Sequence, residues 1–164
     1  MADYKGVSLV MYEKEKHDKH LKTIAKDMRD IDVFELLATG SDDVEAAVRE
    51  SVDNSWSAFF LLDRKGYPLC VFGIIPNTIG EEVYDGNIIW CLGTKRLIKH
   101  KTAFVHWASE IISWWKREFG VLFNFISVDN DKSIKWLRTL GAEFSEPFPV
   151  GDGYLFKKFT IGGD

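Results

Sequence analysis

The feature that most constrains the fold is a long amphipathic segment enclosed by two strand-like segments. Between Thr102 and Gly120, apolar residues recur three and four positions apart, which is the spacing of one face of an α-helix. Thr102 is a candidate N-cap, and Gly120 ends the helix. The flanking residues 87–92 and 121–128 are strand-like, so the sequence predicts a strand–helix–strand crossover. The apolar stripe consists of Phe104, Trp107, Ala108, Ile111, Ile112, Trp115 and Phe119.

Helices and hairpin strands are predicted on both sides of this crossover. Before the second helix, Asp30-Ile31-Asp32 offers a cap, and Ser41 is the expected N-cap of the third. The order β-α-α-α-β-β-β-α-β-α-β-β favours a mixed α/β or α+β fold with antiparallel hairpins in the middle and one β-α-β crossover in the C-terminal half. The remaining expected strands are residues 7–12, 56–62, 68–75, 142–146 and 154–161, and the remaining helices are residues 17–28, 33–37, 44–48 and 133–140.

Composition indicates one globular domain over residues 1–164, with 46% hydrophobic and 28% charged residues. The 25 acidic residues outnumber the 21 basic ones, which argues against direct contact with nucleic acid. Cys70 and Cys91 are the only cysteines, too few for a disulfide scaffold or a four-thiolate zinc site. No segment approaches the roughly 20 apolar residues of a membrane span. These features predict a chain that works in a reducing compartment.

A basic segment joins the strand at residues 87–92 to the long helix. Residues 93–102 contain five side chains that are basic or can become so. Positive side chains at a helix N-terminus oppose its macrodipole, and a bound anion would relieve this conflict. Three interpretations stay open, namely a solvated charge run, a site for the phosphates of acyl-CoA or a related nucleotide, and a contact with protein or nucleic acid.

The segment Asn130-Asp131-Lys132-Ser133 follows the next strand and opens a short helix. Asn130 can bond to exposed backbone at the strand end, either as a structural cap or as part of a binding site. His17 and His20 lie three residues apart, but without a third ligand nearby we expect an exposed pair and no metal site.

Several further side chains have a structural interpretation. His106 is expected to face solvent, and both cysteines are expected to be buried and inert. Trp114 and Trp136 flank the predicted core faces, where they either pack at the edge of the core or contribute to a protein-binding surface.

The C-terminal half resembles the GCN5-related N-acetyltransferase (GNAT) family. In that family, a strand, a phosphate-cradling loop and a helix precede a second strand and an Asn-containing motif. Asn130, Ser133 and the pair Leu140-Gly141 match that motif. More narrowly, residues 90–94, 138–141 and 159–163 resemble a family of small tailed-phage proteins that includes an internal virion protein and is described as acetyltransferase-like.

The resemblance implies a central, mostly antiparallel twisted sheet flanked by helices, with acetyl-CoA as the cofactor of active members. The loop motif of the family, [Arg/Gln]-x-x-Gly-x-[Gly/Ala], aligns with residues 96–101. Lys99 and Lys101 stand at its two small positions, and Leu137 stands where many members have a proton-donating Tyr. The cofactor-binding residues that the resemblance implies are Leu92, Thr94, Arg96, Lys99, His100, Lys101, Thr102, Asn130 and Ser133.

Catalytic candidates lie in the acidic segment before residue 87. Glu81, Glu82 and Asp85 are carboxylates that can deprotonate an amine when burial raises their pKa. Tyr84 is a candidate replacement for the missing acid. Glu82 and Tyr84 are the residues we select for a catalytic role, beside the alternative that this is an exposed turn.

Two hypotheses about function follow. The first is a phage-encoded protein that has the GNAT fold with a degenerate acyl-CoA site and works through protein contacts as a virion-associated or morphogenesis factor. The second is an active acetyl-CoA-dependent N-acetyltransferase acting on a small amine or a host protein. A third idea, an early effector that binds a host enzyme, is neither supported nor excluded. The resemblance places the chain in the host bacterial cytoplasm, with packaging in the virion, and makes phage or host proteins its partners.

Overall fold

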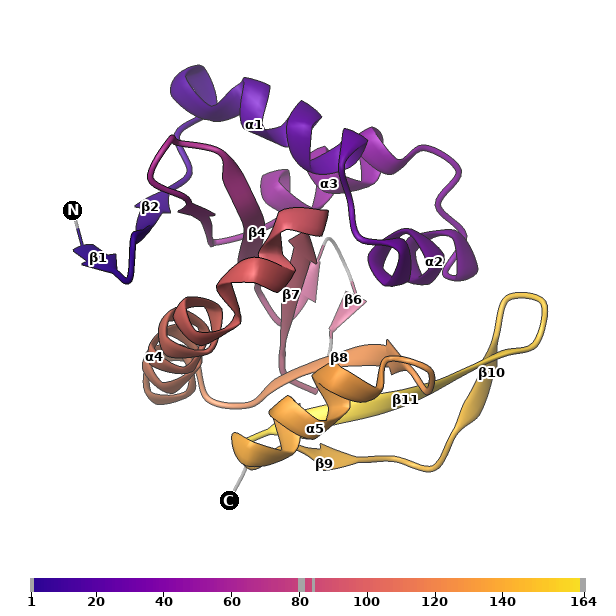
Figure 1. The fold of residues 1–164 in the computed structure, drawn as a ribbon. Coiled ribbons are helices and arrows are strands. Elements are labelled where there is room, and N and C mark those ends of the chain that lie inside the picture. The colour runs from indigo at the N-terminus through magenta and orange to yellow at the C-terminus, as the bar shows by residue number, and fades with distance from the viewer. Residues whose placement is uncertain (1, 80–81, 84, 163–164) are drawn as a thin grey trace.

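The computed structural model describes residues 2–79, 82–83 and 85–162. Its main sheet has the strand order β1-β2-β3-β4-β7-β8-β11-β10, with β9 also paired to β11 (Figure 1). A small hairpin, β5 (Thr78–Ile79) with β6 (Glu82–Val83), lies apart from it. The strands of the main sheet are β1 (Ala2–Tyr4), β2 (Val7–Met11), β3 (Ser57–Leu62), β4 (Pro68–Ile75), β7 (Asn87–Gly93), β8 (Leu122–Ser127), β9 (Glu143–Phe144), β10 (Phe148–Val150) and β11 (Tyr154–Ile161).

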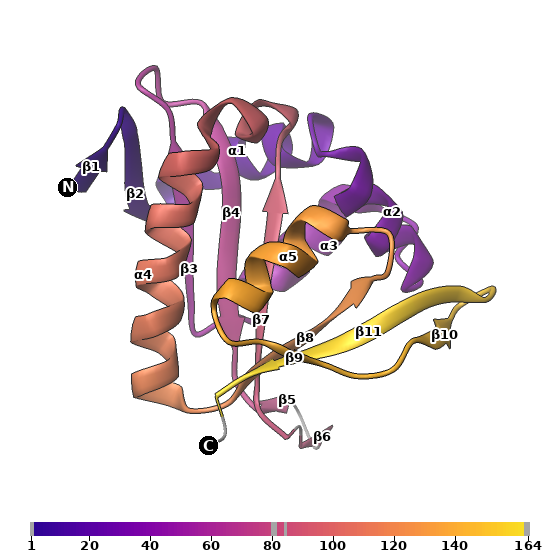
Figure 2. The same ribbon diagram turned by 60° about the horizontal axis from the view of Figure 1, so that its bottom comes forward.

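Among the described strands, only β7 and β8 pair in parallel. Their pairing covers Asn87 with Leu122 and Ile88 with Phe123, and beyond these residues the two strands spread apart. Figure 2 shows β7 and β8 side by side at one end and separated at the other. We call this divergence the fork. The mixed α/β fold and the β-α-β crossover are therefore confirmed.

Helices cover both faces of the sheet. α4 and α5 lie on one face, and α1 and α3 lie on the other, while α2 is placed beside the open end of the fork (Figure 2). A 3₁₀ helix, η1, leads directly from β7 into α4. The helices are α1 (Lys14–Lys26), α2 (Asp30–Ala38), α3 (Val44–Asp53), η1 (Lys95–His100), α4 (Lys101–Phe119) and α5 (Asp131–Thr139).

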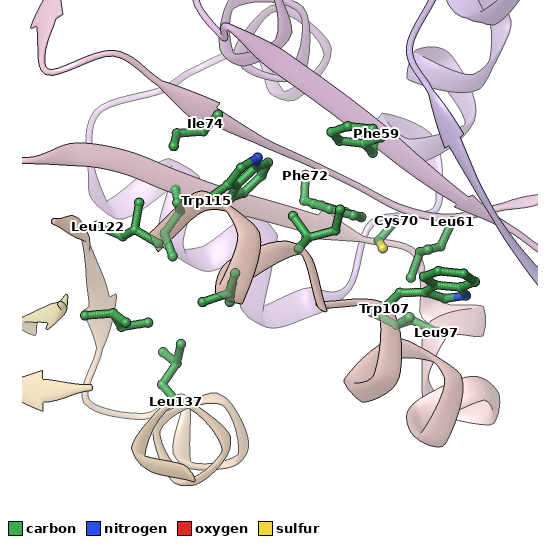
Figure 3. Packing of buried hydrophobic residues seen from close by; sticks show 14 of the residues in the cluster. Phe59, Leu61, Cys70, Phe72, Ile74, Leu97, Trp107, Trp115, Leu122 and Leu137 are labelled. Carbon is green, nitrogen blue, oxygen red and sulfur yellow. The ribbon is translucent and has the colours of Figure 1, made fainter. Parts of the chain in front are cut away.

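The alternation of side chains along β3 explains why both faces must be covered. Phe59 and Leu61 pack into the cluster under α4, whereas Ala58 and Phe60 pack into the cluster under α1 and α3. Every residue of β4 is buried, as expected for a strand with helices on both faces. In Figure 3, Trp115 of α4 lies against β4 beside Phe72 and Ile74.

Three predicted helix caps are wrong. Asp43, and not Ser41, is the N-cap of α3, since its carboxylate accepts a hydrogen bond from Ala46 N at 3.1 Å. α4 begins at Lys101 with His100 as its N-cap, because η1 already occupies the segment that would lead up to Thr102. α2 has Arg29 as its N-cap without a side-chain bond.

Some strands and side-chain environments also differ from expectation. The strand expected over residues 142–146 is only the two-residue β9, and β1, β10 and the β5–β6 hairpin were not predicted. His17 is buried instead of exposed, since its ring packs against Tyr12 and Phe60, and its Nδ1 accepts a hydrogen bond from Glu13 N at 2.9 Å. His106 is half-buried rather than solvent-facing, and it stacks on Tyr4 with ring centroids 3.8 Å apart.

The packing predicts a large difference between a buried and an exposed leucine. Leu69→Ala, at a fully buried position of β4, is expected to lower the free energy of unfolding by about 2–5 kcal/mol, because it leaves a cavity. Leu37→Ala, at an exposed position of α2, is the matched control and should change it by less than about 0.5 kcal/mol. Equal effects of the two substitutions in urea titrations would contradict this core.

Candidate functional site

The fork encloses the main cavity of the described structure. At the point of divergence, the Asn124 side chain donates a hydrogen bond to the Ile89 carbonyl across the gap at 2.7 Å. Beyond it the cavity has a volume of about 450 Å³, within the range of small-molecule sites. Its walls are mostly apolar and come from β4, β7, β8, β11, α4 and α5, whereas its polar end is formed by α2 and the start of α5. The lining includes Phe72, Trp90, Phe104, Ile111, Trp115, Trp136, Leu137, Phe156 and Phe159.

A buried carboxylate of α2 binds the end of β7. Asp32 is 3% exposed and accepts two hydrogen bonds from the Arg29 guanidinium, at 2.8 and 2.9 Å. The same carboxylate accepts the backbone N–H of Gly93, the last residue of β7, at 2.8 Å. The bidentate pair explains why this charge is tolerated in the interior, and Asp32 in turn raises the pKa of Arg29.

A second carboxylate, one helical turn later, binds the end of β8. Glu35 accepts the backbone N–H of Ser127, the last residue of β8, at 2.7 Å, and the Asn130 side chain donates to it at 3.4 Å. The pKa of Glu35 is raised to about 7, mainly by burial; the bond from Ser127 opposes this rise, and the nearby negative charge of Asp32 adds to it. Glu35 therefore changes charge close to neutral pH, at the polar end of the cavity.

Together, these two carboxylates connect α2 to both branches of the fork. Asp32 and Glu35 are three residues apart, so they lie on the same face of α2. Our sequence interpretation treated Asp32 only as part of a cap and did not select Glu35 or Arg29. The signal that could have found them is a pair of acids at helical spacing among apolar residues of a predicted helix, where a carboxylate needs a partner.

The structure separates the predicted cofactor-binding residues into three places. Leu92, Asn130 and Ser133 line the fork cavity. Thr94 is fully buried, and its hydroxyl lies 3.1 Å from the carbonyls of Pro68 and Leu69, so it has an internal structural role.

The remaining predicted residues lie on the surface. Arg96 stacks over the Tyr67 ring, 3.8 Å from its centroid, with the Asp63 carboxylate also 3.8 Å away. The other predicted residues line a shallow depression of about 300 Å³ at the start of α4. This depression is formed by Lys5, Ile98, Lys99, His100, Lys101, Thr102 and Ala103.

The predicted catalytic residues lie mostly outside the described part. Glu81 and Tyr84 are not among the described residues, and for Glu82 only the backbone, in β6, is described. Asp85 is exposed. Leu137, at the position of the proton-donating Tyr in many GNAT members, is 5% exposed and lines the fork cavity.

Other predicted sites have structural explanations. Within the residues that the structure describes, no group of three potential ligands could hold a metal ion. None of the helices there is long and apolar enough to cross a membrane. Cys70 is buried and Cys91 is half-buried. Trp114 and Trp136 pack at the edge of the core, and Trp136 contacts Phe104 with ring centroids 5.2 Å apart.

The sheet, the fork and the helices around it define the GNAT fold. A GNAT-family acetyltransferase from Bacillus anthracis superposes with a TM-score of 0.63 over 98% of this chain and 96% of its own, at 12% sequence identity. A GCN5-related N-acetyltransferase from Kribbella flavida gives a TM-score of 0.66 over 96% and 98%, at 14% identity. At these identities the likeness concerns the fold alone.

A phage protein is similar in sequence as well. The family model described as "Bacteriophage T7, probable scaffold protein Gp13" matches residues 74–149. The "Probable scaffold protein gp13" of Escherichia phage T7 is 25% identical over 133 residues, which cover 78% of this chain and 89% of that protein. The expected resemblance to a phage protein with the GNAT fold is thus confirmed.

The α2 contacts predict that Asp32 stabilises the fold more than its exposed neighbour does. Asp32→Ala leaves the Arg29 charge and the Gly93 N–H without their partner, so the free energy of unfolding should fall by about 3 kcal/mol. Asp30→Ala, at a 98% exposed side chain on the same helix, should change it by less than about 0.5 kcal/mol. Chemical denaturation of both variants measures the difference, and a similar loss in both would contradict the role of Asp32.

The raised pKa of Glu35 predicts a pH-dependent stability. In the unfolded chain Glu35 loses its proton near pH 4.5, and in the folded chain near pH 7, so ionisation destabilises the fold progressively across this window. Glu35→Gln removes this dependence. Between pH 4 and a pH above 7, the free energy of unfolding of the natural chain should therefore fall by about 1–3 kcal/mol more than that of the variant.

The control for this measurement is Glu50→Gln, at an exposed position of α3. Thermal or urea unfolding at several pH values should give the Glu50 variant the same pH profile as the natural chain. The assignment to Glu35 fails if the Glu35 variant also keeps the natural profile.

Proposed function

We propose that this chain is a phage morphogenesis protein that uses the GNAT fold for protein contacts and does not transfer acetyl groups. The sequence similarity to the probable scaffold protein of phage T7 supports this role. The proposal includes a degenerate acyl-CoA site, expression in the host bacterial cytoplasm and association with the virion or its assembly intermediates.

The observation that carries the loss of acetyl-CoA use is the conformation of the loop before α4. Cradling a pyrophosphate requires backbone N–H groups that point outward and small residues that let the phosphate approach. Here the segment forms η1, and two of its backbone N–H groups already donate inside the fold, Leu97 N to Thr94 O and Lys95 N to Asp27 O, both at 3.0 Å. Lys99 and Lys101 occupy the two positions where the resemblance calls for small residues. This loop therefore fits a pyrophosphate poorly.

The open end of the fork gives a second, independent reason. Backbone N–H groups at the ends of diverging strands are the natural donors for a ligand that enters the gap. In this chain, Gly93 N and Ser127 N already donate to Asp32 and Glu35. A ligand that used these donors would have to displace two carboxylates of α2, which would leave Asp32 with Arg29 alone and Glu35 with Asn130 alone as hydrogen-bond donors.

The third reason is the position of Leu137. Its aliphatic side chain lines the fork cavity and cannot donate a proton to a leaving thiolate. Ser133, four residues earlier on α5, does carry a hydroxyl and lines the cavity, but it lies one turn away.

The alternative function is an active N-acetyltransferase on a small amine or host protein. Glu35 favours it, because a carboxylate with a pKa of about 7 in a cavity is suited to accept a proton from an amine. In that case the exposed lysines of η1 would hold the phosphates as point charges, Asn130 would orient the cofactor, and water or Tyr84 would supply the proton. Acetyl-CoA supplies the acetyl group in this alternative.

Calorimetric titration with acetyl-CoA separates the two functions. Under our proposal, the natural chain binds more weakly than about millimolar, which corresponds to about −4 kcal/mol, and releases no CoA thiol with a panel of primary amines. The double variant Lys99→Gly/Lys101→Gly restores small residues to the loop, and binding by this variant alone would show that the lysines block it. Lys99→Gln/Lys101→Gln is the matched control, since it removes the two charges while it keeps the bulk of the side chains.

Micromolar binding by the natural chain, about −8 kcal/mol, together with release of CoA would overturn the proposal in favour of the enzyme. The morphogenesis role is tested on the phage that encodes the chain. Mass spectrometry should find the protein at a fixed copy number in purified particles or in purified assembly intermediates. Its absence from both would count against an assembly role.

A further inference from the structure

Resting on the proposed function, we propose a docking surface for an acidic partner protein along one edge of the molecule. The surface, which we call the basic edge, combines the β1–β2 turn, the end of α1, the β3–β4 turn, η1 and the start of α4. These segments lie together at the upper edge of the molecule in Figure 2. All cations of the basic edge are exposed, and they are Lys5, Lys26, Arg64, Lys65, Lys95, Arg96, Lys99 and Lys101.

Contacts between these segments make the basic edge one continuous surface. The Arg64 side chain lies against Gly6, so closely that a β-carbon on Gly6 would overlap it. Arg96 of η1 stacks on Tyr67, which follows the β3–β4 turn. At the other end, Lys95 N donates to the Asp27 carbonyl, directly after α1, at 3.0 Å.

The acids near this surface do not neutralise it. Asp63 accepts the backbone N–H groups of Lys65 and Tyr67, both at 2.9 Å, and Asp27 accepts the Tyr67 hydroxyl. The Asp30 carboxylate and the Lys95 ammonium group are 3.9 Å apart, at the upper limit of an ion pair.

Six cations of the basic edge form no ion pair with an acidic side chain of the described residues, Lys65 among them. The other five are Lys5, Lys26, Arg64, Lys99 and Lys101. A surface with this excess of positive charge attracts an anionic partner and speeds its association.

The start of α4 strengthens the positive potential. The N-terminal end of a helix carries a partial positive charge, and the first turn of α4 contains no acidic residue to offset it. Lys99 and Lys101 add full charges at this end, and Lys5 faces them across the 300 Å³ depression. Negative groups placed in the depression would be stabilised by side chains from two segments that are far apart in the sequence.

An apolar side chain in the middle of the basic edge favours a protein over a nucleic acid. Ile98 is 56% exposed and lines the same depression as Lys99 and Lys101. A phosphate backbone gives such a side chain no apolar partner. An acidic protein segment that carries one apolar residue complements the lysines and Ile98 together.

Fluorescence anisotropy with defined probes tests this surface. The probes are a labelled glutamate-rich peptide with one central leucine, the same peptide with asparagine instead of leucine, and a short DNA duplex. We expect the leucine peptide to bind best at low salt. Lys5→Glu/Lys99→Glu/Lys101→Glu should weaken this binding by about tenfold or more at low NaCl, and the effect should shrink at high NaCl.

Two matched variants make the result specific. The control variant Lys116→Glu/Lys132→Glu/Lys135→Glu changes the net charge by the same amount, at exposed positions of α4 and α5 away from the basic edge. It should bind the leucine peptide within about twofold of the natural chain. Ile98→Asn should weaken binding of the leucine peptide and leave that of the asparagine peptide unchanged, as expected for a direct contact. Circular dichroism confirms that each variant is folded.

The proposal is wrong if both triple variants lose affinity equally, if Ile98→Asn affects both peptides alike, or if the DNA duplex binds more tightly than the leucine peptide. Acetyl-CoA serves as a competitor to separate this proposal from the proposed function. If acetyl-CoA displaces the peptide, the basic edge is a cofactor site and both proposals fail. If neither acetyl-CoA nor the leucine peptide binds, the docking surface alone is wrong.

Discussion

The rest of the structure depends on how the fork between β7 and β8 is closed. A sheet that changes from antiparallel to parallel pairing and then diverges leaves backbone N–H and C=O groups without strand partners, and such groups are costly when buried. This chain satisfies them with side chains. Asn124 bridges the point of divergence, and two carboxylates of α2 bind the far ends, at Gly93 and Ser127. The position of α2 therefore follows from the hydrogen-bonding needs of the sheet.

In this chain, side chains of α2 fill the open end of the fork of the GNAT fold. Acetyltransferases share the architecture at 12–14% identity, so the architecture places few demands on individual side chains. In this chain the polar end of the fork is already occupied by the Asp32–Arg29 pair and Glu35, and the loop before α4 is wound into η1 with lysines outward. Charge that is concentrated on a surface, rather than aimed into a cavity, is suited to recognising another protein.

The main elements could be predicted because their signals are local. The stripe on α4 has helical spacing, and the strands of the β3–β4 hairpin are separated by a recognisable turn. The caps were less predictable, since Ser41 and Asp43 are both good N-cap residues and lie only two positions apart. Asn130 and Ser133 were found through a motif and do line the cavity, but Glu35 and Arg29 belong to no motif and become visible only when α2 meets the strand ends.

By itself, the sequence determined the order of the helices and of the longer strands, and the crossover that makes β7 and β8 parallel. It also determined that lysines and Leu137 stand at positions where the acetyltransferase pattern has other residues. Tertiary structure alone decided which side chains meet at the fork and which cations share the basic edge. The physical reason is the distance along the chain over which each interaction acts. Periodicity and capping act over a few neighbouring residues, whereas the bonds from Asp32 to Gly93 and from Glu35 to Ser127 join residues 61 and 92 positions apart, which only the folded sheet brings together.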